Sequence, residues 1–395
     1  MMTLSQAARF AQGRLIGADG EVLRVITDSR QAQPGDLFVA LKGERFDAHD
    51  FVAEVTSKGA AALVRDGFEL AGASLIQAGE DTRLALGRLA AGWRETQPAV
   101  RIGVTGSNGK TTVKEMLAAI LRAHAGVDAV LATAGNFNND IGLPLTLLQL
   151  KPQHRYAVIE MGMNHHGELS YLTGLTRPQV ALVNNAMRAH FGHFGSTEDV
   201  ARAKAEIFEG LADGGVAVVN ADDANLPLFR AAAVALALDV PLSAIAAGLA
   251  VFGGAKGRLQ IKQSPRGLTV IDDSYNANPD SMKAGIDVLA GLPGPHCFVM
   301  GDIGELGEAS PALHAEVGEH ARLRGIEQLF ALGEASRRAV AAFGAAGQGF
   351  DSIDELLECL DSRLASGTAV LVKGSRFMRM ERVVEHLMQA KKEGV

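Results

Sequence analysis

The chain has 395 residues, a formal net charge of −7 at pH 7 and a pI near 5.9. This length predicts about two or three domains, and the acidic balance argues against the broad basic surface of a nucleic-acid-binding protein. The two cysteines have no spacing partners, and a charge and a proline interrupt the longest apolar stretch, residues 231–249. We therefore expect a cytoplasmic protein without disulfides, membrane insertion or nucleic-acid partners.

The first segment of the chain, residues 1–98, has the short apolar runs of a small α/β domain. Strand-like runs occur at residues 36–41 and 60–64, and a polar link at residues 94–98 closes the segment. We expect a first domain that ends at Pro98.

The second segment opens with an apolar strand at residues 100–104, followed by a glycine-rich turn and a run of good helix formers. Strand, glycine-rich turn and helix are typical of a phosphate-binding loop, in which backbone N–H groups surround phosphate oxygens. We expect ATP here, with Lys110 at the outer phosphates and the Thr111 hydroxyl on Mg²⁺. The stricter motif requires glycine where this chain has Val104, and the alternative is a glycine-rich turn before an ordinary helix. The predicted ATP-binding residues are Gly106, Ser107, Asn108, Gly109, Lys110, Thr111 and Thr112.

Continuous apolar runs then alternate with helical stretches, as expected of parallel strands buried on both faces. These runs predict a mostly parallel central domain at residues 99–252 and a Rossmann-like C-terminal domain at residues 253–395. Polar residues follow many of the runs, where parallel sheets bind ligands, and we expect two facing crevices with the site between domains. The runs are residues 156–159, 180–183, 216–219, 268–271, 297–300, 328–332 and 369–372.

A helix is predicted from Ser196, which forms a capping box with Asp199. Lys204 falls on the apolar stripe of this helix, so its amine must reach solvent, pair with an acid or lose its charge. A neutral amine could instead react with CO₂ and become a metal-binding carbamate. Glu160 and His190 are candidate Mg²⁺ ligands, although a histidine is more often a surface or hydrogen-bonding residue.

These motifs closely resemble those of the Mur ligase family of bacterial cell-wall enzymes, over nearly the whole chain. The matching stretches are residues 105–115 for the ATP loop, 160–162 for a metal-binding strand end, and 189–208 for a histidine and a modified lysine. The resemblance implies that Thr111, Glu160, His190 and a carbamylated Lys204 bind Mg²⁺. It thereby favours functional roles for His190 and Lys204.

Within the family, residues 272–282, DDSYNANPDSM, are similar to members that add D-alanyl-D-alanine to UDP-N-acetylmuramoyl-tripeptide. The implied substrates are these two molecules and ATP, the implied reaction is amide formation through an acyl phosphate, and a monomer is expected. The implied catalytic residues are Lys110, Glu160, His190, Lys204, Arg258, Lys373 and Arg376. Asp273 and Asn276 are implied in ATP binding. Substrate binding is implied for Ser29, Arg30 and Lys42, which resemble the uridine-nucleotide site of the first domain, and for Thr133, Asn136, Asn138, Asn139, Tyr275 and Asn278.

The chain departs from the family between Arg230 and Ala231, where a segment with an adenine-associated motif is expected and absent. A natural deletion and an incomplete sequence both explain the gap. The alternatives are another Mur-type or folylpolyglutamate-synthase-like ligase, a nucleotide-binding relative inactivated by the gap, and a P-loop ATPase that drives motion.

Overall fold

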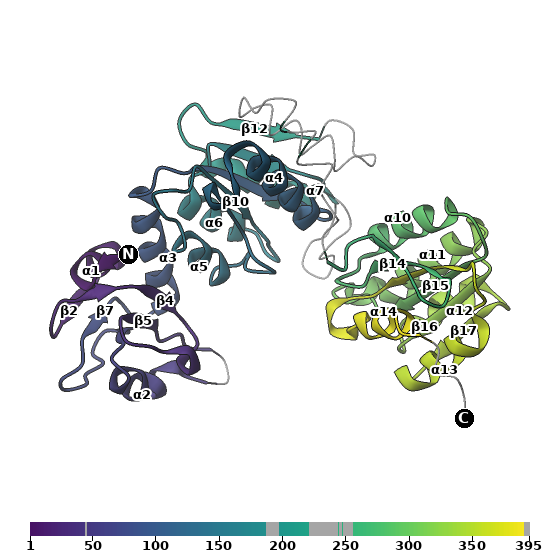
Figure 1. Cartoon of the computed structure of the whole chain (residues 1–395), viewed down its shortest axis with the longest axis horizontal. Helices are drawn as coiled ribbons and strands as arrows, with labels where there is room; N and C mark the ends of the chain where they lie inside the picture. The colour runs from purple at the N-terminus through teal and green to yellow at the C-terminus, as the bar shows by residue number, and fades with distance from the viewer. Residues whose placement is uncertain (44–45, 187–196, 221–243, 245–246, 248–255, 391–395) are drawn as a thin grey trace. The chain divides into compact units, whose positions relative to one another are not determined.

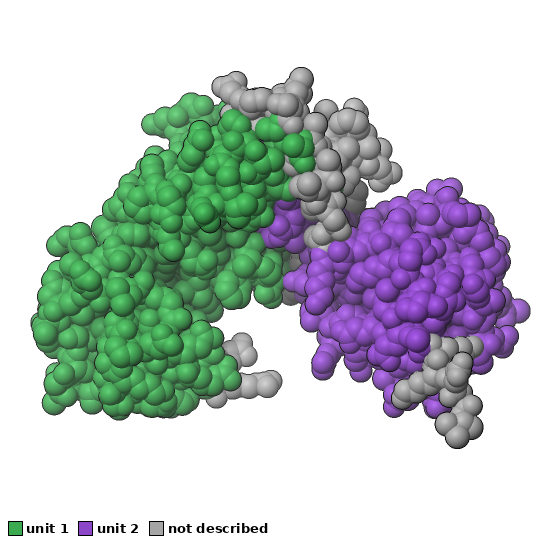
Figure 2. Space-filling model, viewed as in Figure 1, with its two compact units in different colours: residues 1–106, 116–184, 203–251 green, residues 107–115, 185–202, 252–395 purple. Residues whose placement is uncertain are grey.

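The computed structural model describes residues 1–43, 46–186, 197–220, 244, 247 and 256–390, which include three sheets of five or six strands (Figure 1). The chain divides into two compact units (Figure 2). The first contains residues 1–106, 116–184 and 203–251, and the second contains residues 107–115, 185–202 and 252–395. Among the described residues, no helix is long and apolar enough to cross a membrane.

The first sheet has five strands in the order β2-β7-β6-β5-β4, and β2 alone runs antiparallel to its neighbour. Its apolar strands bury Leu37, Phe38 and Leu63 completely. The strands are β1 Met2–Thr3, which pairs with β3 Glu21–Val22 outside this sheet, and β2 Arg14–Ile16, β4 Arg24–Ile26, β5 Asp36–Val39, β6 Ala61–Val64 and β7 Leu75–Gln77. The helices are α1 Leu4–Ala11, η1 Ser29–Gln31, η2 Ala48–Phe51, α2 Val52–Ser57 and α3 Thr82–Glu95.

Helix α3 joins the first sheet to the second within the same unit. Asp81 caps its N-terminus by accepting from the backbone N–H groups of Arg83 and Leu84. Near its C-terminus, Trp93 Nε1 donates to the carbonyl of Leu150 at 3.0 Å, and Arg94 Nε donates to the carbonyl of Leu175 at 3.0 Å. These buried contacts hold the helix against the central part of the chain. The predicted domain boundaries at residues 98 and 252 remain predictions.

The second sheet is fully parallel, with the order β12-β11-β8-β10-β9. The predicted strands are confirmed, but β12 lies at the edge, where Val216 is 42% and Val219 64% exposed, so its predicted burial on both faces is wrong. The strands are β8 Val100–Thr105, β9 Val130–Ala132, β10 Tyr156–Glu160, β11 Val180–Val183 and β12 Val216–Val219. The helices are α4 Lys110–Ala125, η3 Val127–Ala129, α5 Gly142–Leu147, α6 Glu168–Thr176, α7 Thr197–Ala205 and η4 Glu206–Gly210.

The third sheet has the order β13-β14-β18-β15-β16-β17, and β13 alone runs antiparallel to its neighbour. Successive residues of β14 point to opposite faces, because Ile271 packs in a core with α10, α11 and α12, whereas Val270 packs in a core with α13 and α14. The result is a sheet with helices on both faces, which confirms the predicted Rossmann-like domain (Figure 1). The strands are β13 Gln260–Gln263, β14 Thr269–Asp273, β15 His296–Gly301, β16 Gln328–Leu332, β17 Gly347–Phe350 and β18 Ala369–Lys373. The helices are α10 Pro279–Ala290, η5 Gly307–Ala309, α11 Ser310–Leu323, α12 Arg337–Phe343, α13 Ile353–Arg363, η6 Arg376–Met378 and α14 Glu381–Leu387.

Candidate active site

The predicted phosphate-binding loop follows β8, the middle strand of the central sheet, and leads directly into α4. Gly109 has a φ of +72°, a left-handed conformation that glycine adopts without steric cost. Asn185 holds the loop: its Oδ1 accepts from the backbone N–H of Asn108 at 2.8 Å, and its Nδ2 donates to the Asn108 carbonyl at 3.1 Å. Lys110 Nζ lies 3.4 Å from the carbonyl oxygen of Ser107. The sequence had indicated Asn185 only as a polar residue after a strand.

Glu160 ends β10, the neighbour of β8, and is only 2% exposed. Its backbone N–H donates to Thr133 Oγ1 at 3.0 Å, and its Oε1 accepts from Asn138 Nδ2 at 2.9 Å. The backbone N–H of Gly162 in turn donates to the Asn138 carbonyl at 2.8 Å. The structure therefore brings Thr133 and Asn138, both predicted to bind substrate, to the predicted metal ligand.

The other two asparagines of this turn have different surroundings. Asn139 Oδ1 accepts from the backbone N–H of Gly142 at 2.8 Å, at the start of α5. Asn136 is exposed, and its carbonyl accepts from the backbone N–H of Asn138 at 2.7 Å. Asn139 thus shapes the turn, while the side chain of Asn136 lies on the surface.

Lys204 is 1% exposed in α7, as the apolar stripe predicted, and its neighbours Val200, Ala203 and Ile207 are completely buried. The interpretation in which its amine reaches solvent is therefore wrong. The predicted continuous helix ends at Ala205, where a 3₁₀ turn begins. His190 and Ser196 lie outside the described residues, as does the junction of Arg230 and Ala231.

The described residues contain no group of three or more His, Cys, Asp or Glu side chains that could hold a metal ion. The fit to Mg²⁺ depends instead on the kind of donor. Glu160 offers a buried carboxylate that a neighbouring amide orients, and Thr111 offers a half-buried hydroxyl. Hard oxygen donors of this kind suit Mg²⁺.

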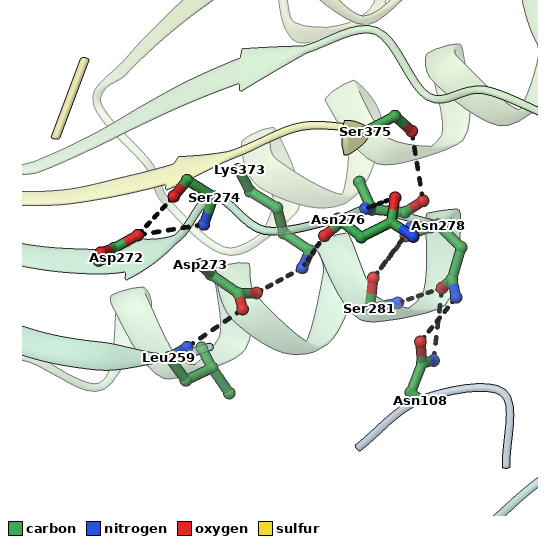
Figure 3. Close-up of polar contacts among 11 residues, drawn as sticks. Asn108, Leu259, Asp272, Asp273, Ser274, Asn276, Asn278, Ser281, Lys373 and Ser375 are labelled. Carbon is green, nitrogen blue, oxygen red and sulfur yellow. Dashed lines mark hydrogen bonds and ion pairs between the residues drawn. The ribbon is translucent and has the colours of Figure 1, made fainter. Parts of the chain in front are cut away.

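A second polar cluster lies at the carboxyl ends of β14 and β18, which are neighbours in the third sheet (Figure 3). Lys373 Nζ pairs with Asp273 Oδ2 and donates to the carbonyl of Asn276 at 3.0 Å. Asp273 Oδ1 accepts from the backbone N–H of Leu259 at 3.1 Å. Lys373 and Asp273 are 3% and 7% exposed, so this ion pair is largely shielded from water.

Asn278 caps the start of α10 through reciprocal hydrogen bonds with Ser281. Its side chain also exchanges hydrogen bonds with the side chain of Asn108, at 2.6 Å and 3.4 Å (Figure 3). A predicted ATP-binding residue and a predicted substrate-binding residue therefore contact each other within the second unit.

Tyr275 carries two guanidinium groups near its ring. The central carbon of Arg258 lies 4.3 Å from the ring centroid, and that of Arg376 lies 5.6 Å from it. Arg376 also pairs with Glu381 at 2.9 Å. Three predicted site residues thus lie together, with two guanidinium groups beside one aromatic ring.

The predicted uridine-nucleotide residues lie in the first domain. Arg30 is exposed, and its guanidinium donates to both carboxylate oxygens of Asp28, at 2.8 Å and 2.7 Å. These hydrogen bonds are the main reason why the pKa of Asp28 falls to about 2. Lys42 is exposed, and its backbone forms an isolated antiparallel β-bridge with that of Asp47. Ser29 follows Asp28 at the start of a 3₁₀ turn.

The fold and these motifs agree with comparisons to known proteins. The family model described as "Mur ligase family, catalytic domain" matches residues 21–94, "Mur ligase middle domain" matches residues 104–250, and "Mur ligase, glutamate ligase domain" matches residues 257–376. The chain belongs to the Mur ligase family.

Individual relatives are similar along their whole length. The UDP-N-acetylmuramoyl-tripeptide–D-alanyl-D-alanine ligase of Escherichia coli is 41% identical over 451 residues, covering 98% of each chain. A crystal structure of MurF from Acinetobacter baumannii has a TM-score of 0.90 and 35% identity, with 98% of each chain covered. MurF of Thermotoga maritima, solved in complex with ADP, has a TM-score of 0.82 and 26% identity, covering 92% of this chain and 97% of its own.

Proposed function

We propose that this chain is an ATP-dependent ligase that joins D-alanyl-D-alanine to UDP-N-acetylmuramoyl-tripeptide. The observation that carries the proposal is the 41% identity to the Escherichia coli ligase of that name across 98% of both chains. The phosphate-binding loop and the polar strand ends of the third sheet support it, because they supply one site for a nucleotide and another for an acceptor. These substrates favour a cytoplasmic location.

The reaction needs two steps. ATP transfers its terminal phosphoryl group to the free carboxylate of the tripeptide, which gives an acyl phosphate and ADP. The amine of D-alanyl-D-alanine then attacks the acyl carbon, so that a C–N bond forms, the C–O bond to phosphate breaks, and the amine loses a proton. Exclusion of water would protect the acyl phosphate from hydrolysis.

The loop of residues 106–112 would bind the phosphates, and Lys110 would neutralise charge on the transferred group. Thr111, Glu160, His190 and carbamylated Lys204 would hold Mg²⁺, which supplies further charge neutralisation when bound. In the second cluster, both oxygens of Asp273 contact groups of the protein, Lys373 Nζ and the Leu259 N–H. This favours an indirect role for Asp273, which would orient Lys373 toward the nucleotide or substrate.

For the remaining predicted residues, the part of the chain in which each lies indicates which substrate it would contact. Arg258 and Arg376, beside Tyr275, would contact anionic groups of the substrates, and Asn276 and Asn278 would contact the nucleotide and the peptide. Ser29, Arg30 and Lys42 would bind the uridine nucleotide. Thr133, Asn136, Asn138 and Asn139 form the turn predicted to bind substrate in the central domain.

One observation favours a second candidate function, a nucleotide-binding protein without ligase activity. The alignment with the Escherichia coli ligase runs over 451 residues, although this chain has 395, so dozens of positions of the relative have no counterpart here. A loss at the predicted junction of Arg230 and Ala231 would remove residues associated with adenine binding.

The test is phosphate release by the purified chain with ATP, Mg²⁺ and UDP-N-acetylmuramoyl-tripeptide, with and without D-alanyl-D-alanine. The ligase predicts release that depends on the dipeptide and falls roughly 10²- to 10³-fold in Lys110→Ala, since that variant loses a group that stabilises the transferred charge. ATP binding by folded protein without dipeptide-dependent release would favour the second candidate. Release that needs no acceptor would instead indicate an ATPase.

A further inference from the structure

His314, in α11, is completely buried and has no part in the reaction described above. Its Nε2 lies 3.0 Å from the backbone nitrogen of Ile303, and its Nδ1 lies 2.7 Å from the carbonyl oxygen of Ser310. A backbone N–H can only donate and a carbonyl can only accept, so Nδ1 carries the proton and Nε2 accepts. The two backbone partners therefore select one uncharged tautomer.

Ile303 belongs to a tight loop, residues 302–307, that follows β15. Ile303 and Leu306 are 4% and 5% exposed and anchor the loop in the core, while Glu305 has a φ of +61°. A non-glycine residue in this left-handed conformation costs energy, so the surrounding contacts must hold the loop in place.

Two other elements provide such contacts. Ser375, which follows β18, accepts from the backbone N–H of Gly304 through its Oγ at 2.8 Å, and its own N–H donates to the Asp302 carbonyl at 3.1 Å. The Asp302 carboxylate accepts from the backbone N–H of Ser336, just before α12, at 2.8 Å. His314 completes the set from a third element. Ser375 and His314 hold the two sides of the peptide unit that joins Asp302 to Ile303, Ser375 also holds the next peptide unit, and the Ser336 N–H holds the Asp302 side chain.

The location of the loop connects it to the reaction. The order β14-β18-β15 puts the carboxyl ends of these three strands side by side, and they carry Asp273, Lys373 and the 302–307 loop respectively. Ligands of open parallel sheets bind at this edge. The polar strand ends of this sheet are proposed above to supply the acceptor site, so the 302–307 loop lies at the edge where the amine substrate would bind.

We propose that His314 is a positioning residue for the amine substrate: its uncharged ring fixes the 302–307 loop, which forms one wall of the dipeptide site. This inference rests on the proposed function for the identity of the amine. An imidazole suits the task because it is rigid and presents an acceptor and a donor on opposite sides of one ring. A leucine would fill similar space but leave the N–H of Ile303 buried without an acceptor.

Two variants separate shape from hydrogen bonding. His314→Leu removes both hydrogen bonds, whereas His314→Gln can accept from Ile303 through its Oε1 and donate to Ser310 through its Nε2. In His314→Leu we expect the KM for D-alanyl-D-alanine to rise roughly three- to tenfold, the effect of about one hydrogen bond. The KM values for ATP and for UDP-N-acetylmuramoyl-tripeptide should change less than about twofold, and His314→Gln should restore most of the loss.

Hydrogen exchange followed by mass spectrometry gives a readout that does not depend on activity. Peptides that contain residues 302–307 should exchange faster in His314→Leu than in the wild type. Peptides from β15 and from the C-terminal half of α11 should be unchanged, because the loop alone loses a contact. A merely structural histidine would instead loosen the whole core around α11.

An equal rise in all three KM values, exchange spread through the C-terminal domain, or no change in either measurement would overturn the proposal. If His314→Leu does not fold, Ser375→Ala tests the same loop from its other side, since it removes the acceptor of the Gly304 N–H, and the same KM and exchange patterns are expected. Wild-type protein that releases no phosphate with the dipeptide would refute the proposed function and with it the dipeptide site. The exchange measurement would then still show whether His314 holds the loop.

Discussion

Asn138 donates a hydrogen bond from its side-chain amide to Oε1 of Glu160 at 2.9 Å. The two residues lie 22 positions apart in the sequence and meet because the turn after β9 passes the carboxyl end of β10. A carboxylate that binds a metal ion is commonly oriented by such a hydrogen bond, and losing the partner weakens metal binding. The contact gives Asn138 a role in holding Glu160, in addition to the predicted contact with substrate.

Asn138→Leu is therefore expected to weaken metal binding by roughly ten- to a hundredfold, the usual effect of losing a residue that orients a metal ligand. Titration with Mn²⁺ in the presence of ATP, followed by electron paramagnetic resonance, measures this directly. Gln149→Leu, an amide-to-leucine change at an exposed position in the turn after α5, serves as the control. Equal Mn²⁺ affinity in the wild type and both variants would show that the hydrogen bond does not matter to the metal.

Lys204 gives a prediction about covalent modification. Its side chain is 1% exposed, and the resemblance to the Mur ligases implies that its amine carries a carbamate. Lys204→Ala should lose ligase activity, and short carboxylic acids should restore part of it by supplying a carboxylate in the same place. A high-resolution crystal structure of active enzyme with an unmodified lysine at this position would rule out the carbamate.

The sequence predicted those strands that a local run of apolar residues is enough to define. The runs that form β8, β10, β11, β14, β15, β16 and β18 are continuous and apolar because parallel strands are buried on both faces. The strand β13 Gln260–Gln263 has polar residues, and β17 Gly347–Phe350 contains two glycines, so neither was predicted. Both lie at sheet edges, where pairing with a neighbour and not composition defines the strand.

In the candidate site too, a contiguous motif could be predicted from the sequence, whereas contacts between separate segments could not. The phosphate-binding loop is contiguous, so its residues could be named from the sequence alone. The contact of Lys373 with Asp273, 100 positions apart, depends on β14 and β18 becoming neighbours, and that of His314 with Ile303 depends on how α11 packs against the loop before it. No periodicity encodes those pairs. His314 also sits among apolar residues of α11, where a histidine gives no signal of its partners.

The buried pair of Asp273 and Lys373 predicts a non-additive effect on stability. Asp273→Asn leaves the ammonium group of Lys373 without its counterion and should destabilise the protein by about 3–5 kcal/mol. The double variant Asp273→Asn with Lys373→Met removes both charges and should be more stable than Asp273→Asn alone. Urea denaturation of the wild type, Asp273→Asn, Lys373→Met and the double variant measures the coupling. Additive losses would mean that the ion pair contributes no coupling energy.

Arg30 gives a prediction for the first domain. Arg30→Ala should raise the KM for UDP-N-acetylmuramoyl-tripeptide roughly tenfold or more, because a hydrogen bond to a charged group is lost, and should leave the KM for ATP unchanged. Since the pKa of Asp28 is about 2, the ion pair that holds Arg30 stays intact at any ordinary assay pH. Arg9→Ala, at an exposed position in α1, controls for the lost charge. A change in the KM for ATP alone would contradict the assignment of this domain to the uridine nucleotide.

Burial of His314 predicts how stability depends on pH. Desolvation lowers the pKa of His314 below its ordinary value, against smaller opposing effects of the Ser310 carbonyl and the Asp302 carboxylate. Below about pH 6.5 the unfolded chain therefore binds a proton at this residue that the folded chain does not bind, so stability falls as pH falls through this range. The loss attributable to His314 is at most about 1.4 kcal/mol per pH unit, and it stops below the lowered folded-state pKa. His314→Gln has no proton to bind and should lack this part of the loss. Urea denaturation of the wild type and His314→Gln at several values between pH 7.5 and pH 5 measures the difference, and parallel curves would show that His314 is not held uncharged.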